Sequence, residues 1–169
     1  NDVTAASRRA GLQPSRRFNV EVIPATGCVQ GKHYTDVNHV STLMADRLGG
    51  RSYQIHAPLF ADDAEQRAML INMRAVADVF KRAREAKVAV VGIGSILSDD
   101  SSYYDLHPSS STDRAAIERS GASCELLAHL LDDHGQVCDY SLNRSLVSLT
   151  LSEFASIPTK IGVASGPNK

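Results

Sequence analysis

The chain contains no tryptophan, and aromatic residues make up only 5% of its 169 positions. Proteins that bind single-stranded nucleic acids stack bases on aromatic side chains, so this composition argues against such a surface. Basic residues are not in excess either: 18 Lys and Arg face 19 Asp and Glu, which leaves a net charge of −1. Because a free-standing DNA-binding domain normally carries a basic surplus, we do not expect this chain to bind DNA by itself.

Cysteines are few and long apolar runs are missing. The three cysteines, Cys28, Cys124 and Cys138, form no C-x-x-C pair, and their odd number argues against a disulfide framework. A reducing, cytoplasmic location is therefore expected. No apolar run approaches the roughly 18 residues that a transmembrane helix needs, so no membrane partner is predicted.

Helical and strand patterns alternate along the chain, which predicts an α/β fold with a mainly parallel sheet flanked by helices. On the helix that begins at Asp36, apolar residues at helical spacing form one side: Val37, Val40, Leu43, Met44 and Leu48. Helices are predicted over residues 2–10, 36–48, 64–73, 75–85, 113–119 and 152–157. Strands are predicted over residues 20–23, 53–55, 87–91, 146–149 and 160–164, and residues 124–131 and 137–140 are predicted to form a small β-hairpin elaboration.

The clearest strand is at residues 87–91. It is continuously apolar and rich in β-branched residues, which is typical of a parallel strand covered on both faces. On the preceding helix, Val76, Val79, Phe80 and Ala83 share one side, whereas its basic residues point largely outward.

Three predicted strands run directly into glycine and small polar residues. The first loop contains Thr26 and Gly27, the second contains Gly94 and Ser95, and the third is Gly166–Lys169. In open α/β sheets, ligands bind beyond the carboxyl ends of the strands, where backbone N–H groups can hold an anion. Glycine turns end strands in any α/β domain, but three such loops together favour a ligand pocket. A sugar phosphate is one anion that would suit it.

Two enzyme motifs are incomplete in the sequence. Gly92 and Gly94 lack the third glycine of a dinucleotide-binding fingerprint, because Leu97 stands in its place. Ser95 lacks the bracketing glycines of a hydrolase nucleophile elbow. We therefore predict neither a nucleotide cofactor nor a serine nucleophile, and no other cofactor.

Cys124, His129, His134 and Cys138 are spaced like zinc ligands, but Cys124 and His129 would point to opposite faces of an extended strand. No metal site is therefore predicted. Glu125 is a carboxylate among apolar residues. It could hydrogen-bond a sugar hydroxyl, act as a base, or be an exposed glutamate on an edge strand, and its spacing alone leaves these alternatives open.

A set of short motifs together resembles the effector-binding domain of the SorC family. They are residues 87–95 (KVAVVGIGS), 121–126 (GASCEL), 142–143 (LN), 149–154 (LTLSEF), 157–158 (IP) and 163–169 (VASGPNK), in that family's order. The resemblance covers most of the chain from residue 20 onward. It implies the sensing domain of a bacterial transcriptional regulator of sugar metabolism, with a phosphorylated sugar or polyol as effector. It also implies a fold like that of sugar-phosphate isomerases and glucosamine-phosphate deaminases.

The resemblance also assigns site residues. It implies a first effector loop, a polar contact on the following helix, a central glycine loop, an acidic residue and a lysine that contacts the phosphate. Cys124 stands where the family motif has a glycine before the acidic residue. The implied ligand-binding residues are Thr26, Gly27, Asn38, Gly94, Ser95, Glu125 and Lys169.

The chain departs from the family pattern at several places. The family's DNA-binding domain is missing, so we expect residues 1–169 to be a single, incomplete effector domain that reaches DNA through a domain outside this chain, within a homo-oligomer. The family's strand and phosphate-binding loop have no counterpart between Ala10 and Pro14, which predicts a gap in the ordered chain there. The family's Asn-Asp-Arg is Asn-Arg-Ser at residues 143–145.

The favoured interpretation is a binding domain without enzymatic activity. The alternative is a sugar-phosphate isomerase or deaminase that uses Glu125 as its base. No Asp or His lies in a motif that would place it beside Glu125, and acid–base turnover normally needs a second group, which favours binding.

Overall fold

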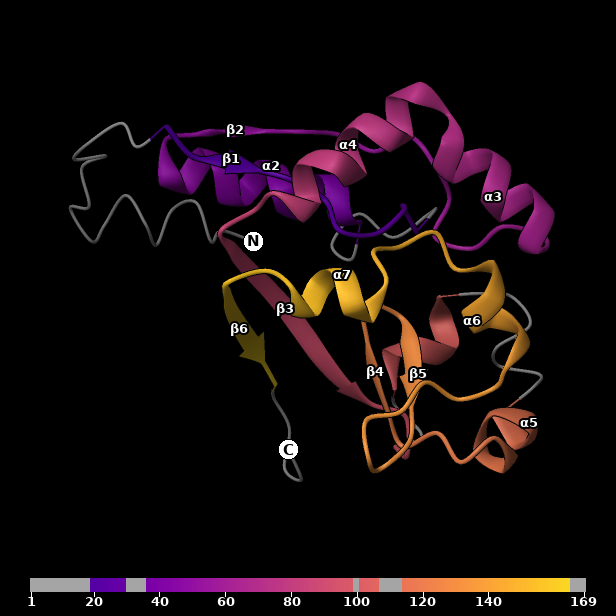
Figure 1. Cartoon of the computed structure of the whole chain (residues 1–169). Helices are drawn as coiled ribbons and strands as arrows, with labels where there is room; N and C mark the ends of the chain where they lie inside the picture. Colours follow the sequence, from indigo (N-terminus) through magenta and orange to yellow (C-terminus); the bar gives the residue numbers. More distant parts are fainter. Residues whose placement is uncertain (1–18, 30–35, 99–100, 107–113, 165–169) are drawn as a thin grey trace.

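A computed structural model of the chain describes residues 19–29, 36–98, 101–106 and 114–164 (Figure 1). The predicted helix at residues 2–10, the expected gap between Ala10 and Pro14, and the Gly166–Lys169 loop lie outside these residues. In chain order the elements are β1 (Glu21–Val22), α2 (Val37–Leu48), β2 (Arg51–Ser52), α3 (Ala64–Asn72), α4 (Arg74–Arg84), β3 (Val88–Ser95), the 3-10 helix η1 (Ser102–Asp105), α5 (Arg114–Arg119), β4 (Cys124–Leu126), β5 (His129–Leu131), α6 (Ser141–Ser145), α7 (Leu151–Ala155) and β6 (Thr159–Val163).

These elements confirm the α/β class, but the larger of the two described sheets is mixed. β1 and β2 form a small parallel sheet. The second sheet has the order β5-β4-β3-β6: β3 is parallel to β6 but antiparallel to β4, and β4 is antiparallel to β5. The expectation of a mainly parallel sheet is therefore wrong for this sheet. Antiparallel neighbours need only a tight turn, whereas a parallel neighbour needs a long crossover.

The tight turn is at Leu127 and Ala128, inside the segment predicted as one strand. Both residues have positive φ, 52° and 62°, and they reverse the chain so that β4 pairs with β5. Two-residue hairpin turns of this kind favour Asn and Gly, so Leu and Ala gave no turn signal. The second predicted arm is present, since Leu131 bridges Val137 and the Cys138 N–H donates to the Leu130 carbonyl over 2.9 Å.

The predicted apolar side of α4 lies in the main core. Val76, Val79, Phe80 and Ala83 are buried there. Other buried members of this cluster are Ile55, Ala57, Ala61, Val147, Leu149 and Ile157. A second cluster, around Ile96, Tyr103, Ile117 and Leu130, supports the β4–β5 hairpin. The segment at residues 146–149, predicted as a strand, forms only isolated bridges, through Leu146 and Ser148.

The predicted apolar side of α2 faces the core only in part: Val37 packs against the main core, whereas Val40, Leu43 and Leu48 are exposed. Asp36 caps the helix by accepting the His39 N–H, and Gly49 ends it with φ 66°, close to the predicted bounds. Its buried residues are the small Ser41 and Ala45, whereas the predicted side is half-exposed or exposed at Val37, Val40, Leu43, Met44 and Leu48. α2 packs on the short β1–β2 sheet, where small residues allow a close approach.

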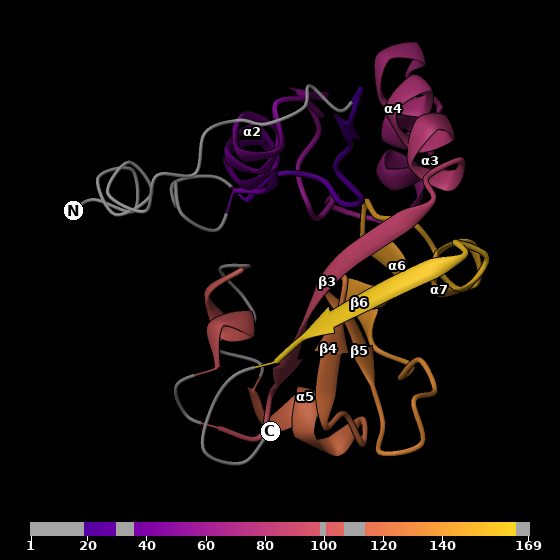
Figure 2. The same ribbon diagram turned by 90° about the vertical axis from the view of Figure 1, so that its left-hand side faces the viewer.

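β3 is likewise covered on one face only. Val91 is buried and Ala89 packs against the main core. Side chains alternate between the faces of a strand, so Val88 and Val90 lie on the opposite face, where both are exposed. Their partners in β6 are also exposed, and Figure 2 shows the two strands side by side. No described residue covers this face. Within the described part of the chain, the prediction that both faces of this strand are covered is therefore wrong.

Candidate functional site

Gly94 and Glu125 meet at the end of β3. They are directly paired residues in the β3–β4 ladder. The Glu125 side chain folds over its partner: a Cβ at position 94 would lie 2.6 Å from Glu125 Oε1. The other carboxylate oxygen, Oε2, accepts the Ala128 N–H over 3.1 Å. Glycine is thus required at position 94 for the carboxylate to lie against the strand.

The Thr26 loop reaches this hairpin through Ser148. Thr26 and Ser148 form an antiparallel bridge, and the Gly27 N–H donates to the Val147 carbonyl over 2.8 Å. The Ser148 hydroxyl lies 3.3 Å from the Leu127 carbonyl oxygen, in the turn that follows Glu125. The Thr26 loop is therefore joined to the β4–β5 turn by a serine that no sequence motif includes. It sits in an apolar segment and carried no motif signal.

Gly27 has a structural reason to be glycine. A Cβ at this position would overlap the Pro58 carbonyl oxygen, because the loop runs directly beside residues 57–59. The Cys28 N–H donates to the Ala57 carbonyl, and the Leu59 N–H donates to the Cys28 carbonyl, each over 2.8 Å. This close backbone pairing holds the predicted first effector loop in place.

Asn38 ties α2 to the segment after β2. Its Oδ1 accepts the Ile55 N–H and its Nδ2 donates to the Ile55 carbonyl, both over 2.9 Å. The same Nδ2 lies 3.0 Å from Cys28 Sγ. Burial, and the nearby Asp36 charge, raise the pKa of the Cys28 thiol. The amide of Asn38 thus has a structural function, and its predicted contact with ligand remains a prediction.

Ser95 does not share the face of Glu125. It follows Gly94 in an extended strand, so the two residues point to opposite faces. The Ser95 hydroxyl oxygen accepts the Leu97 N–H over 3.3 Å, which shapes the end of β3. Lys169 lies outside the described residues. The structure thus joins Gly94 and Glu125 directly, connects Thr26 and Gly27 to them through Ser148, and places Asn38 and Ser95 in other contacts.

The described residues contain no group of three or more His, Cys, Asp or Glu side chains that could hold a metal ion. His129 is buried, and its Nε2 lies 3.0 Å from the Leu149 carbonyl oxygen. Burial lowers the pKa of this histidine. Within the same residues, none of the helices combines the length and the apolar character needed to cross a membrane.

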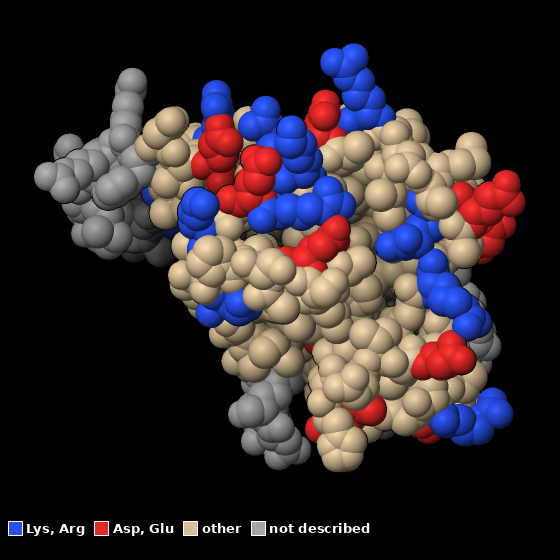
Figure 3. All heavy atoms as spheres, in the orientation of Figure 1, with Lys and Arg blue, Asp and Glu red and all other residues tan. Residues whose placement is uncertain are grey.

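Charged side chains on the face shown in Figure 3 are mixed in sign. Glu21 pairs with Arg51 and lies 3.8 Å from Arg82, and Arg84 pairs with Glu153 over 2.6 Å. Basic and acidic groups are interspersed on this face. It is not the basic surface that a nucleic acid would need.

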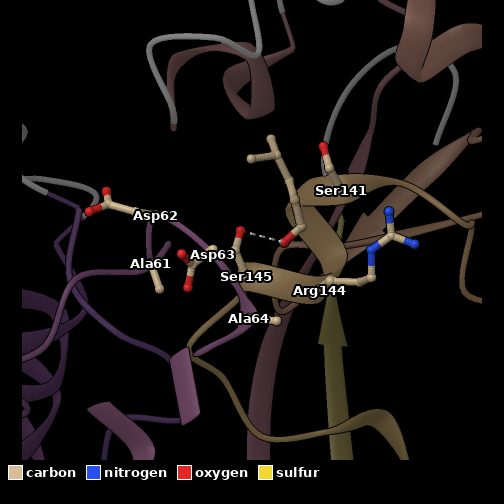
Figure 4. Close-up of a pocket in the computed structure, with 8 residues that line it drawn as sticks. Ala61, Asp62, Asp63, Ala64, Ser141, Arg144 and Ser145 are labelled. Carbon is tan, nitrogen blue, oxygen red and sulfur yellow. Dashed lines mark hydrogen bonds between the residues drawn. The ribbon is translucent and has the colours of Figure 1, made fainter. Parts of the chain in front are cut away.

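A cleft of about 460 Å³ lies where α3 begins, beside α6 (Figure 4). Its charged groups are engaged with their own chain: Asp62 Oδ2 accepts from the Gln66 side chain and Asp63 caps α3, each over 2.8 Å. Arg144 likewise donates to Asp139 over 2.8 Å. None of the predicted ligand-binding residues that the structure describes lines this cleft.

Comparison with known proteins gives a family match over most of the chain. The model of the Sugar-bind family, described as "Putative sugar-binding domain", matches residues 4–169. The transcriptional regulator LsrR of Escherichia coli O9:H4 (strain HS) is 37% identical over 117 residues, 68% of this chain. LsrR of Enterobacter sp. (strain 638) is 35% identical over the same length. The chain spans only 37% and 36% of these two relatives.

Solved structures share the fold. The full-length sorbitol operon regulator SorC of Klebsiella pneumoniae superposes with a TM-score of 0.81 and 20% identity, over 90% of this chain and 50% of that one. A DeoR family transcriptional regulator from Listeria monocytogenes gives a TM-score of 0.77 and 19% identity, over 87% and 57%. At these identities the likeness concerns the fold.

Proposed function

The chain belongs to the Sugar-bind family of sugar-binding domains, and from this premise we propose that it is the effector-sensing domain of a bacterial regulator of carbohydrate catabolism. The proposed effector is a phosphorylated sugar or polyol. The proposed output is a change in DNA binding by a domain outside this chain. Both relatives named above are transcriptional regulators, and the family match includes all the described residues.

The position of Glu125 carries the proposal. Its carboxylate is held at the end of β3 by the bare backbone of Gly94 and by the Ala128 N–H. Ligands of open α/β folds bind beyond the carboxyl ends of the strands. A fixed carboxylate at that place is a strong acceptor for the hydroxyl groups of a sugar or polyol.

We assign the remaining predicted residues around this carboxylate. The Thr26–Gly27 loop, connected to the hairpin through Ser148, lines the effector site, and Lys169 supplies the cation for the phosphate. The Asn38 and Ser95 side chains hydrogen-bond the backbone of Ile55 and Leu97, and we propose that they support the site by holding these segments in place.

Effector binding changes the relative populations of two arrangements of the subunits. In a homo-oligomer, a ligand that binds one arrangement of the subunits more tightly stabilises that arrangement. Glu125 and the Thr26 loop belong to different segments, so a ligand that contacts both would hold the hairpin and the loop in one relative position. Binding, without turnover, is sufficient for this function.

Thermal unfolding of the 169-residue chain with added ligands tests the proposal. The panel contains glucose 6-phosphate, fructose 6-phosphate, ribose 5-phosphate, their reduced polyol phosphates, the unphosphorylated sugars and inorganic phosphate. A ligand at a hundred times its Kd stabilises the folded state by about 2.7 kcal/mol. We expect at least one phosphorylated member to do so, and we expect Glu125→Gln to reduce its effect.

The exposed Glu85, beyond the start of β3, provides the matched control. Glu85→Gln removes the same charge from the amino end of the strand and should leave the shift unchanged. Stabilisation by no member of the panel, or an equal loss in both variants, would contradict the proposal. The appearance of an isomerised or deaminated product that Glu125→Gln abolishes would replace it with the enzymatic alternative.

A further inference from the structure

Gly92 is a glycine for which the described fold gives no reason. It lies within β3, two residues before Gly94, and the two therefore share a face of the strand. At Gly94 a Cβ would collide with Glu125, but at Gly92 a Cβ would meet nothing within 4 Å. Its φ is not in the left-handed range, so no backbone strain requires glycine there.

A glycine inside a strand has a cost. It destabilises the strand by roughly 0.5–1 kcal/mol relative to alanine. Glycines in such places often mark the point where a ligand or another backbone approaches closely. Gly92 is exposed, and among the described residues no atom lies within 4 Å of the place that a Cβ there would occupy. A ligand is a group that would use this bare backbone.

The groups on the two sides of Gly92 differ in polarity. Across the ladder to β6 its partner is Val163, which is 55% exposed. On the other side of β3 the Glu125 carboxylate lies over Gly94. Because the strand order is β4-β3-β6, the exposed backbone at Gly92 has a carboxylate toward one side and an apolar side chain toward the other.

This pattern matches the chemistry of a sugar or polyol. Such a molecule has hydroxyl groups that need acceptors and a carbon skeleton whose C–H groups pack on apolar or bare surface. We propose that Gly92 is a specificity-determining position of the effector site, where the carbon skeleton of the ligand lies on the strand backbone with hydroxyl groups toward Glu125. This inference rests on the proposed function, because it assigns Gly92 to that same site.

The test compares two single-methyl additions to the same sheet. Gly92→Ala adds a methyl to the proposed ligand face. Gly162→Ala is the matched control, because Gly162 pairs with Val91 and so lies on the opposite face, where its Cβ would meet only the end of the Ile93 side chain. Gly92→Ser serves as a second variant at the test position. Each chain is unfolded thermally without ligand and then titrated calorimetrically with the panel above.

We expect Gly92→Ala to keep or slightly raise the melting temperature. Its affinity for the sugar phosphate that binds the unsubstituted chain should fall at least tenfold, while Gly162→Ala binds normally. Normal binding by both Gly92 variants would overturn the inference while leaving the proposed function standing. An equal loss in Gly162→Ala would also overturn it. If the unsubstituted chain binds nothing in the panel, the proposed function fails, and this inference fails with it.

Discussion

Glu125 occupies the space above Gly94 that a side chain at position 94 would fill. The distance from Oε1 to the position of that Cβ is 2.6 Å, and the two residues are paired across β3 and β4. A methyl group there would therefore displace the carboxylate and break its bond to the Ala128 N–H. Because the carboxylate ends a flexible side chain and can move aside, we expect the cost of Gly94→Ala to equal that of the lost hydrogen bond, roughly 0.5–1.5 kcal/mol.

Urea unfolding measures this cost. Gly92→Ala is the direct comparison, because it adds the same methyl to the same face of the same strand, where space is open. Equal stability of the Gly94 and Gly92 variants would show that Glu125 does not lie against the strand as described.

Tyr103 should tolerate the loss of its hydroxyl group. The residue is 1% exposed, and among the described residues its hydroxyl has no hydrogen-bond partner. Burial raises the pKa of this hydroxyl, with smaller contributions from Tyr140 and Glu125. Removing an unpartnered buried group is neutral or stabilising. We expect Tyr103→Phe to unfold at the same urea concentration as the unsubstituted chain or at a higher one.

Tyr104 is the matched control for this prediction. Its hydroxyl donates to the Ile96 carbonyl over 2.9 Å. Tyr104→Phe leaves that carbonyl without this donor, so we expect a loss of about 1–3 kcal/mol. If Tyr103→Phe proves as costly as Tyr104→Phe, the hydroxyl of Tyr103 has a partner after all.

His129 should make stability depend on pH. Burial lowers its pKa in the folded state below the ordinary value of 6.5. The unfolded chain then binds more protons than the folded chain between the two pKa values, so stability rises with pH in that window. We expect the free energy of unfolding to decrease as pH falls below about 6.5 and to level off below the folded pKa.

Denaturant unfolding at a series of pH values measures this slope. His129→Gln can still donate to the Leu149 carbonyl but does not titrate in this range. The slope below pH 6.5 should therefore be shallower in His129→Gln. An unchanged slope would show that the pH dependence arises from other groups.

Asn38 should contribute to stability more than an ordinary helix residue. Its amide makes two hydrogen bonds to the backbone of Ile55, which is fully buried. Asn38→Ala would leave the Ile55 N–H unpaired at a cost of about 1–3 kcal/mol, whereas the Ile55 carbonyl would still accept from the Cys28 thiol over 2.8 Å. We expect Asn38→Ala to lower the free energy of unfolding by an amount in that range. The exposed His39 is the neighbouring control, and His39→Ala should change stability by less than about 0.5 kcal/mol.

The elements that the sequence predicted well are those with local signals. The apolar side of α4, from Val76 to Ala83, is buried as expected because helical periodicity alone specifies it. Asp36 and Gly49 mark the ends of α2 through their capping chemistry. The likeness to the SorC family, carried by motifs such as residues 87–95, is confirmed by the family match.

The features that the sequence did not predict depend on contacts between distant segments. The positive φ of Leu127 and Ala128 is imposed by the β4–β5 pairing and not by residue preference, so the mixed sheet could not be foreseen. The register that places Glu125 on Gly94 is likewise a long-range property. Family motifs identified these residues individually, but Ser148, which connects the Thr26 loop to the hairpin, belongs to no motif.

The most direct test of the proposed effector site is a ¹⁵N–¹H NMR titration of the chain with the phosphorylated sugar or polyol that stabilises it best. We expect saturable shifts in the amide signals of Gly94 and Ala128, which contact the Glu125 carboxylate, and of Gly92 on the same face of β3. Glu125→Gln should weaken the titration, whereas Glu85→Gln should not. If these three amide signals do not change and the signals of residues lining the Asp62–Asp63 cleft do, the proposed effector site is wrong.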